Sequence, residues 1–346
     1  MTQPIGVGIA GTGMAFQAIH ARTLAGLADQ FAITAVWDPD ASRAQQAADW
    51  LGARATASCE ELFADPSVDV AVIASPARFH AEQALVAIRA GKRAVLVEKP
   101  LCLTNAEAQT IAAEAEKHGT ALLVGTMHAF DPAWIAARQA VQGSDFAPDL
   151  IRSTIILPPN AQFEHWATEP LVPATAAGAS PMSMAPDDLM RLCVLELAIH
   201  DLPLVRALLP SDGPVTVLAA RFRQPFGYAI ALRVGDTLVD ISGVIHGHWQ
   251  TDWTLEAQGP QGALQVEFTP SFVSAGSGRM QWDGAAGTHV HLPSDTNGYA
   301  EQWHAIARML NGTQALPSPV EVAKDFAFAH AIAEQAARMV TEETVA

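Results

Sequence analysis

The amino-acid sequence predicts an α/β protein with an N-terminal doubly wound parallel sheet and a C-terminal α+β domain on a large open, mostly antiparallel sheet. At roughly 150 residues per domain, 346 residues correspond to about two domains. Up to about residue 125, unbroken apolar runs alternate with helical segments, which is typical of parallel strands buried on both faces. Beyond residue 127, short strand-like runs broken by glycine dominate. We place the domains at residues 1–126 and 127–346, and the last helix can pack back on the first domain.

The elements of the first domain are bounded by residues that start or stop them. Gly91 and Gly119 suit helix ends, because glycine adopts the left-handed conformation there without steric cost. Thr104 suits a helix N-cap. We expect helices over Met14–Leu27, Ala41–Leu51, Ala77–Ala90 and from Thr104 to Lys117. We expect strands at Ile5–Ala10, Phe31–Trp37, Val68–Ala74, Ala94–Val97 and Ala121–Val124.

The second domain begins with a strand-like run, Ile151–Leu157, and a long loop, Glu164–Pro186, that is rich in Ala, Pro, Ser and Met. A single helix is expected over Leu189–Leu209. The expected sheet strands are Thr216–Arg223, Tyr228–Val234, Thr237–His246, Trp249–Gln258, Ala263–Phe268, Met280–Trp282 and Thr288–Leu292. Two helices, Tyr299–Leu310 and Val320–Val340, close the chain.

Charge and composition narrow the class of ligand. Twenty Lys and Arg against 36 Asp and Glu give a net charge of −16, which disfavours nucleic acid and anionic membranes as partners. No apolar run approaches the roughly 20 residues of a membrane helix. Cys59, Cys102 and Cys193 lack the spacing of a thiolate metal site or a disulfide framework. We therefore expect a cytoplasmic protein with a small-molecule ligand.

A glycine motif lies between the first strand and the first helix. Gly11-Thr12-Gly13 followed by Met14 and Ala15 can bring backbone N–H groups close to a pyrophosphate at a helix N-terminus. Phe16 stands where the dinucleotide motif has a third glycine. The alternative is an ordinary strand–helix turn that binds no ligand.

The second strand ends at Asp38, 25 positions after Gly13. A carboxylate near this spacing can accept hydrogen bonds from both ribose hydroxyls and repels a 2′-phosphate, so it favours NAD over NADP. The alternative role for Asp38 or Asp40 is to cap the helix that follows.

Polar residues also follow two later strands, at the edge where ligands bind in open α/β sheets. Ser75-Pro76 follows one strand, and His80 comes four residues after Pro76. Glu98-Lys99-Pro100 follows another, and Pro100 allows a cis peptide bond. A lysine held at such an edge can take part in proton transfer. The alternatives are a surface or capping histidine and an ordinary surface strand end.

Glu196 and His200 are four residues apart and are expected to share one helical face, with Asp201 following. Histidine titrates near neutral pH and suits a general acid or base, and a nearby carboxylate can orient it. A purely structural His–Glu pair is the alternative.

Together these residues resemble the Gfo/Idh/MocA oxidoreductases, almost from end to end of the chain. The resemblance rests on the following segments: Gly11-x-Gly13, Ser75-Pro76-x-x-x-His80, Ala90-Gly91-Lys92, Val97-Glu98-Lys99-Pro100, Glu196-x-x-x-His200-Asp201 and Leu255–Gly262. It implies a Rossmann domain, NAD as cofactor, and homodimers or homotetramers formed through the second sheet. It also implies hydride transfer at a carbinol carbon of a sugar, inositol or related cyclic polyol.

The resemblance also implies roles for individual residues. Lys99 and His200 flank the reacting hydroxyl, His200 as the base and Lys99 as the group that polarises the oxygen. Glu98 helps to place the nicotinamide and Lys99. The residues expected to contact the cofactor after the later strands are Ser75, Pro76, His80, Glu98 and Lys99. Three departures concern the substrate side: Glu196 replaces a common aspartate, His128 replaces a common arginine, and the long loop carries Trp166. We expect His128, Trp166, Glu196 and His200 to contact a substrate less hydroxylated than a hexose, and we count Glu196 with Lys99 and His200 as catalytic.

Other readings of the same chain remain open. A relative of this kind can use NAD for transient oxidation and elimination in glycoside hydrolysis, with no net redox change. A non-catalytic NAD-binding sensor is a third possibility, which the presence of both Lys99 and His200 disfavours. The pairs His246/His248 and His289/His291 are expected to be strand-face histidines, and no metal is expected.

Overall fold

The computed structural model describes residues 3–159, 184–246, 251–270 and 275–345. Within these ranges the chain forms two compact units. The first contains residues up to 125 together with 302–327, and the second contains the residues from 126 to 301 and from 328 onward. The stretch 302–327, which the sequence boundaries place in the second domain, therefore belongs to the first unit.

The first unit is built on a parallel sheet with the strand order β3-β2-β1-β4-β5-β6. Its strands are β1 Ile5–Ala10, β2 Phe31–Trp37, β3 Arg54–Ala55, β4 Val70–Ile73, β5 Ala94–Val97 and β6 Ala121–Val124. All neighbouring pairs are parallel. The strand order reverses between β1 and β4, and this is the point where open α/β sheets bind ligands. The predicted doubly wound sheet is confirmed, with the short β3 as an unexpected addition.

The helices of the first unit begin and end at capping residues. Asp40 accepts hydrogen bonds from the backbone N–H groups of Ser42 and Arg43, so Asp40, and not Asp38, caps α2. Thr104 and Glu107 form a capping box, an arrangement that stabilises a helix by about 1 kcal/mol. The helices are α1 Ala21–Ala25 after a π-helical turn at Phe16–His20, α2 Ala41–Leu51, α3 Cys59–Ala64, α4 His80–Arg89 and α5 Asn105–His118.

The second unit is built on a mostly antiparallel sheet with the order β14-β13-β12-β11-β7-β10-β9-β8. Only β7 and β10 pair in parallel. Its strands are β7 Leu150–Leu157, β8 Val215–Phe222, β9 Phe226–Val234, β10 Thr237–Ile245, β11 Asp252–Gly259, β12 Gly262–Glu267, β13 Arg279–Gly284 and β14 Gly287–His291. This sheet confirms the predicted second architecture.

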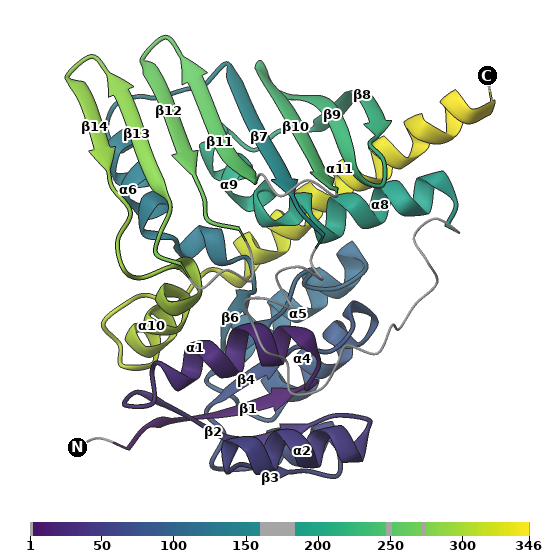
Figure 1. The fold of residues 1–346 in the computed structure, drawn as a ribbon, viewed down its shortest axis with the longest axis vertical. Coiled ribbons are helices and arrows are strands. Elements are labelled where there is room, and N and C mark those ends of the chain that lie inside the picture. Colours follow the sequence, from purple (N-terminus) through teal and green to yellow (C-terminus); the bar gives the residue numbers. More distant parts are fainter. Residues whose placement is uncertain (1–2, 160–183, 247–250, 271–274, 346) are drawn as a thin grey trace. The chain divides into compact units, whose positions relative to one another are not determined.

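Helices pack on one side of this sheet (Figure 1). Buried side chains of α6 Pro132–Val141, α8 Pro186–Glu196, α9 Leu202–Leu208 and the later part of α11 Pro319–Val345 join the sheet in one apolar core. On the other side, Leu238 and Asp240 of β10 are exposed. The helix α10 Gly298–Leu310 precedes α11. Within the described ranges, no helix is long and apolar enough to cross a membrane.

The single helix expected over Leu189–Leu209 is wrong. The helix α8 ends at Glu196, a 3₁₀ turn covers Ala198–His200, and α9 starts at Leu202. Pro203 lies in the first turn of α9. In a continuous helix its ring would clash with the carbonyl of Ile199, so the helix must break before it. Glu196 and His200 therefore do not share one helical face.

Candidate functional site

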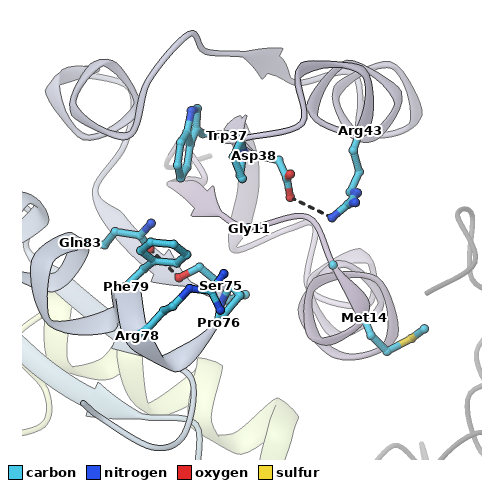
Figure 2. A pocket seen from close by; sticks show the side chains of 13 residues that line it. Gly11, Met14, Trp37, Asp38, Arg43, Ser75, Pro76, Arg78, Phe79 and Gln83 are labelled. Carbon is cyan, nitrogen blue, oxygen red and sulfur yellow. Dashed lines mark hydrogen bonds and ion pairs between the residues drawn. The ribbon is translucent and has the colours of Figure 1, made fainter. Parts of the chain in front are cut away.

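A cavity of about 460 Å³ opens at the carboxyl ends of the first unit's central strands. This volume lies in the range of small-molecule and cofactor pockets. Figure 2 shows side chains from the end of β2 on one side and from the segment after β4 on the other. The lining residues are Gly11, Gly13, Met14, Trp37, Asp38, Pro39, Arg43, Ala74, Ser75, Pro76, Arg78, Phe79 and Gln83.

The glycine turn leaves room for a ligand. Gly11 has a φ of 94°, and a Cβ there would lie 2.7 Å from the backbone of Ala74. A Cβ built on Gly13 would have no atom within 4 Å, so this backbone faces open space. Phe16 is fully buried and packs edge-on against Trp50, with the ring centroids 6.3 Å apart. The bulky residue is thus accommodated inside the unit and does not fill the cavity, so the turn fits a pyrophosphate despite the missing third glycine.

Asp38 is buried and lines the cavity. Its Oδ2 accepts hydrogen bonds from the backbone N–H and the hydroxyl of Thr12, at 2.9 and 3.0 Å, and its Oδ1 accepts one from the N–H of Asp40. A carboxylate offers about four acceptor positions, so capacity remains for a ligand hydroxyl. Arg43 points towards Asp38 with 3.7 Å between Nη1 and Oδ2 (Figure 2). The sequence analysis did not single out Arg43, although its position in the first turn of α2, five residues after Asp38, places it near the end of β2.

His80 ties the two polar strand ends together. Its Nε2 lies 2.7 Å from the carbonyl oxygen of Ser75, and its Nδ1 lies 2.7 Å from that of Pro100. Both ring nitrogens therefore face backbone acceptors, and the ring is buried. Ser75 in turn donates from its hydroxyl to Gln83, at 2.7 Å. Direct contact of His80 with a cofactor stays a prediction, whereas its link between Ser75 and Pro100 is part of the structure.

The segment after β5 carries a buried acid next to a lysine. Glu98 continues the strand, since its N–H donates to the carbonyl of Ile73 on β4. Lys99 is half-buried, and the peptide bond from Lys99 to Pro100 is cis, as the sequence allowed. The carboxylate of Glu98 lies 2.8 Å from Nε2 of His20, a residue that sequence reasoning did not single out. Residue spacing along the chain could not reveal this pair, because 78 positions separate the two residues.

The second unit holds a buried histidine and tryptophan cluster around Asp201. Asp201 accepts hydrogen bonds from the hydroxyl of Ser153, at 2.7 Å, and from the indole N–H of Trp253, at 2.8 Å. The rings of His128 and His200 pack edge-on against Trp253, with centroids 4.4 and 5.5 Å from it. Asp201 thus fixes the tryptophan on which both histidines pack.

His128 is 2% exposed, and its surroundings are aromatic. It stacks on Phe268 with the ring centroids 4.2 Å apart, and its Nδ1 lies 3.6 Å from Asp201 Oδ1. An aromatic environment of this kind is less suited to many hydroxyl contacts than an arginine would be. The burial narrows the surface that His128 can offer to a substrate.

The remaining expected site residues are divided between the two units, or lie outside the described residues. Glu196 is half-buried at the last residue of α8, and Lys99 belongs to the first unit whereas His200 belongs to the second. Trp166 and His248 lie outside the described residues. In the ranges that the structure describes, His, Cys, Asp and Glu side chains form no group of three or more that could hold a metal ion.

A family model and a relative of known name are both oxidoreductases. The family model GFO_IDH_MocA, described as an oxidoreductase family with an NAD-binding Rossmann fold, matches residues 5–126. The chain is 30% identical over 350 residues to inositol 2-dehydrogenase 1 of Saccharopolyspora erythraea, an alignment that covers 91% of this chain and 96% of that protein.

Solved structures share the fold over nearly the whole chain. UDP-N-acetylglucosamine 3-dehydrogenase GnnA from Acidithiobacillus ferrooxidans matches with a TM-score of 0.74 at 19% identity, covering 98% of this chain and 100% of that one. GenD2 from gentamicin A biosynthesis, solved in complex with NAD, matches with a TM-score of 0.71 at 21% identity, covering 97% and 95%. Both units therefore have counterparts in these structures.

Proposed function

Because the chain belongs to the Gfo/Idh/MocA oxidoreductase family, we propose that it is an NAD-dependent dehydrogenase of inositol or a related cyclic polyol. The protein is an oxidoreductase that acts on CH–OH groups. One observation carries the assignment to this chain: His80 ties the turn that bears Lys99 to Ser75, which lines the nucleotide cavity. A lysine is thereby held at the edge of the sheet where a bound dinucleotide would end.

Each proposed catalytic residue has one task. A bound nicotinamide supplies the hydride acceptor when the alcohol is oxidised. Lys99 polarises the reacting oxygen and stabilises the negative charge that develops on it. His200 accepts the hydroxyl proton as general base. Glu98 places the nicotinamide side, and Glu196, His128 and Trp166 contact the substrate.

The same cavity supports proposals for cofactor contacts. Gly11, Gly13, Met14 and Ala15 would hold the pyrophosphate, and Asp38 would accept from the adenosine ribose hydroxyls. Ser75 and Pro76 border the path towards the nicotinamide. The aromatic surroundings of His128 support a cyclic substrate with fewer hydroxyls than a hexose.

The function is tested by titrating cofactor-stripped protein with NAD and NADP, followed by a screen of inositols, sugars and cyclic diols for NADH formation. Tighter binding of NAD and accumulation of NADH with a cyclic polyol are expected. A cofactor that returns unchanged while a glycosidic bond is cleaved would replace the dehydrogenase with a glycoside hydrolase. If neither nucleotide bound, the proposal would be wrong.

Removing the charge of Asp38 is expected to change cofactor preference. In Asp38→Asn the repulsion of a 2′-phosphate disappears while Arg43 stays, so NADP affinity should rise and NAD affinity should fall, each by roughly tenfold. Calorimetric titration of both nucleotides measures the ratio. Asp40→Asn is the matched control, because asparagine also caps helices and the same charge is lost two residues away. If the ratio of NAD to NADP affinity were unchanged in Asp38→Asn, the role of Asp38 would be restricted to its hydrogen bonds with Thr12.

We propose that two copies associate through the exposed face of the second unit's sheet. Leu238 of β10 is 46% exposed on that face. A charged side chain there should weaken a sheet-to-sheet contact, so Leu238→Glu is expected to lower the mass measured by light scattering to that of a monomer. Ile135→Glu, at the exposed side of α6, is the control and should leave the mass unchanged. A wild-type protein that runs as a monomer would refute the proposal.

We also infer that the enzyme works in the cytoplasm, because Cys59, Cys102 and Cys193 are buried and free of disulfides. A net charge of −16 supports a small-molecule substrate, with neither nucleic acid nor membrane as partner. Fractionation of the source cells tests the location.

A further inference from the structure

A buried acid–base pair lies directly beside Lys99. Oε1 of Glu98 is 2.8 Å from Nε2 of His20, and Oε2 accepts a hydrogen bond from the backbone N–H of Lys99 at 3.3 Å. His20 is 2% exposed and Glu98 is 9% exposed. The pair joins the π-helical turn after β1 to the end of β5, and therefore connects the segment after the glycine turn to the segment that carries the lysine.

Neighbouring residues restrict the positions of the Glu98 carboxylate and of the His20 ring. A Cβ built on Gly125, just after β6, would lie 2.8 Å from Oε2 of Glu98, so the absence of a side chain there makes room for the carboxylate. The ring of His20 packs edge-on against Trp303, with the centroids 6.1 Å apart and the planes at 84°. Residues outside the pair therefore fix both side chains, as is expected where a site depends on the orientation of its side chains.

The two ring nitrogens of His20 have different surroundings. Nδ1 of His20 is buried and has no hydrogen-bond partner in the part of the chain that the structure describes. The ring therefore makes its polar contact through Nε2, which faces the carboxylate of Glu98 as a hydrogen-bond donor. Without this donor, the buried carboxylate would keep the hydrogen bond from the Lys99 N–H but would bear a larger desolvation cost.

The electrostatics of Glu98 agree with this geometry. Burial by itself would raise the pKa of Glu98, but the hydrogen bond from His20, with the charges of His20 and Lys99, holds that pKa below its ordinary value. His20 acts on Glu98 from the π-helical turn, and Lys99 acts on it from the neighbouring position. Loss of the His20 donor would leave the effect of burial less opposed.

We propose that His20 is a positioning residue of the reaction, which keeps Glu98 ionised and oriented so that Glu98 in turn fixes the backbone and balances the charge of Lys99. The inference rests on the proposed catalytic role of Lys99. It adds a residue that contacts neither substrate nor cofactor and acts through Glu98.

The first test uses infrared spectroscopy of the cofactor-free protein and needs no activity. In His20→Phe, which keeps an aromatic ring but has no donor, the carbonyl stretch of a protonated carboxylic acid is expected at neutral pH. The band should disappear in the double variant with Glu98→Gln, which assigns it to Glu98. In His20→Gln, whose amide N–H can restore the bond, the band should be weak or absent. His118→Gln, on the surface of α5, controls for loss of a histidine.

The second test is the pH profile of turnover. Because Glu98 must be ionised, the acid limb of kcat should move upward by about three pH units in His20→Phe and return close to wild type in His20→Gln. The affinity for NAD at high pH should stay within a few-fold of wild type. A residue that served stability alone would lower the melting temperature and would leave the acid limb in place.

Two results would overturn the inference. One is a protonated Glu98 in the wild-type protein at neutral pH, detected as a carboxylic acid band that Glu98→Gln removes; this measurement applies even if His20→Phe fails to fold. The other is an ionised Glu98 in a folded His20→Phe. Since both of these infrared results are independent of substrate, a failure of the dehydrogenase assignment would appear separately, as absence of NADH formation with the infrared results intact.

Discussion

Lys99→Met is expected to lower kcat by about 10²- to 10³-fold, because the methionine cannot stabilise the negative charge on the reacting oxygen. Binding of NAD should change little, since the backbone of this segment is held by Glu98 and by the bond from His80 to the carbonyl of Pro100. Steady-state kinetics with the polyol found in the screen, together with calorimetric titration of NAD, measures both quantities.

Lys117→Met is the matched control, because Lys117 is an exposed lysine on α5 whose ammonium forms a surface ion pair with Glu114. Its kcat should equal that of the wild type. A Lys99→Met variant that retained full biological activity while turnover was lost would favour a non-catalytic sensor. Full turnover in the same variant would remove Lys99 from the reaction.

His200→Ala is expected to lower kcat by about 10²- to 10⁴-fold, the usual contribution of a positioned general base. The affinity for NAD should be retained, because the proposed nucleotide contacts come from the first unit and His200 packs against Trp253 in the second. Turnover should recover partly when imidazole is added, since a small base can take the place of the missing ring.

His289→Ala, an exposed histidine on β14, is the matched control and should leave kcat unchanged. If His200→Ala lost NAD binding with little effect on the chemical step, the base assignment would be wrong. A fall in melting temperature without a specific loss in kcat would assign His200 to the packing of the Trp253 cluster instead.

Capping and turn residues, which act on their immediate neighbours in the chain, explain how much of the fold was predictable. The bounds of β2, α2 and β5 agree with those expected from the sequence. Residues such as Gly119 and Thr104 act on their immediate neighbours, so their effect can be inferred without knowing what lies across the sheet. The glycine turn and the Lys99 segment could be placed at the carboxyl edge for the same reason, because strand direction and connection rules are local.

The break before α9 shows where periodicity alone misleads. The apolar spacing of Leu189–Leu209 is helical throughout, and Pro203 was the local signal against one continuous helix. Asp201, at the break, directs its carboxylate to Ser153 and Trp253 on two strands of the sheet. Apolar periodicity does not report such tertiary hydrogen bonds, so the proposed shared face of Glu196 and His200 did not form.

By itself, the sequence determined the two architectures, the family, and the identity of the lysine and histidine proposed for catalysis. Only the tertiary structure decided which side chains meet: His20 with Glu98, Arg43 with Asp38, and His80 with the carbonyls of Ser75 and Pro100. It also assigned residues 302–327 to the first unit. The physical reason is that caps, turns and strand periodicity depend on neighbours in the chain, whereas a buried polar pair depends on which strands and helices come together in space.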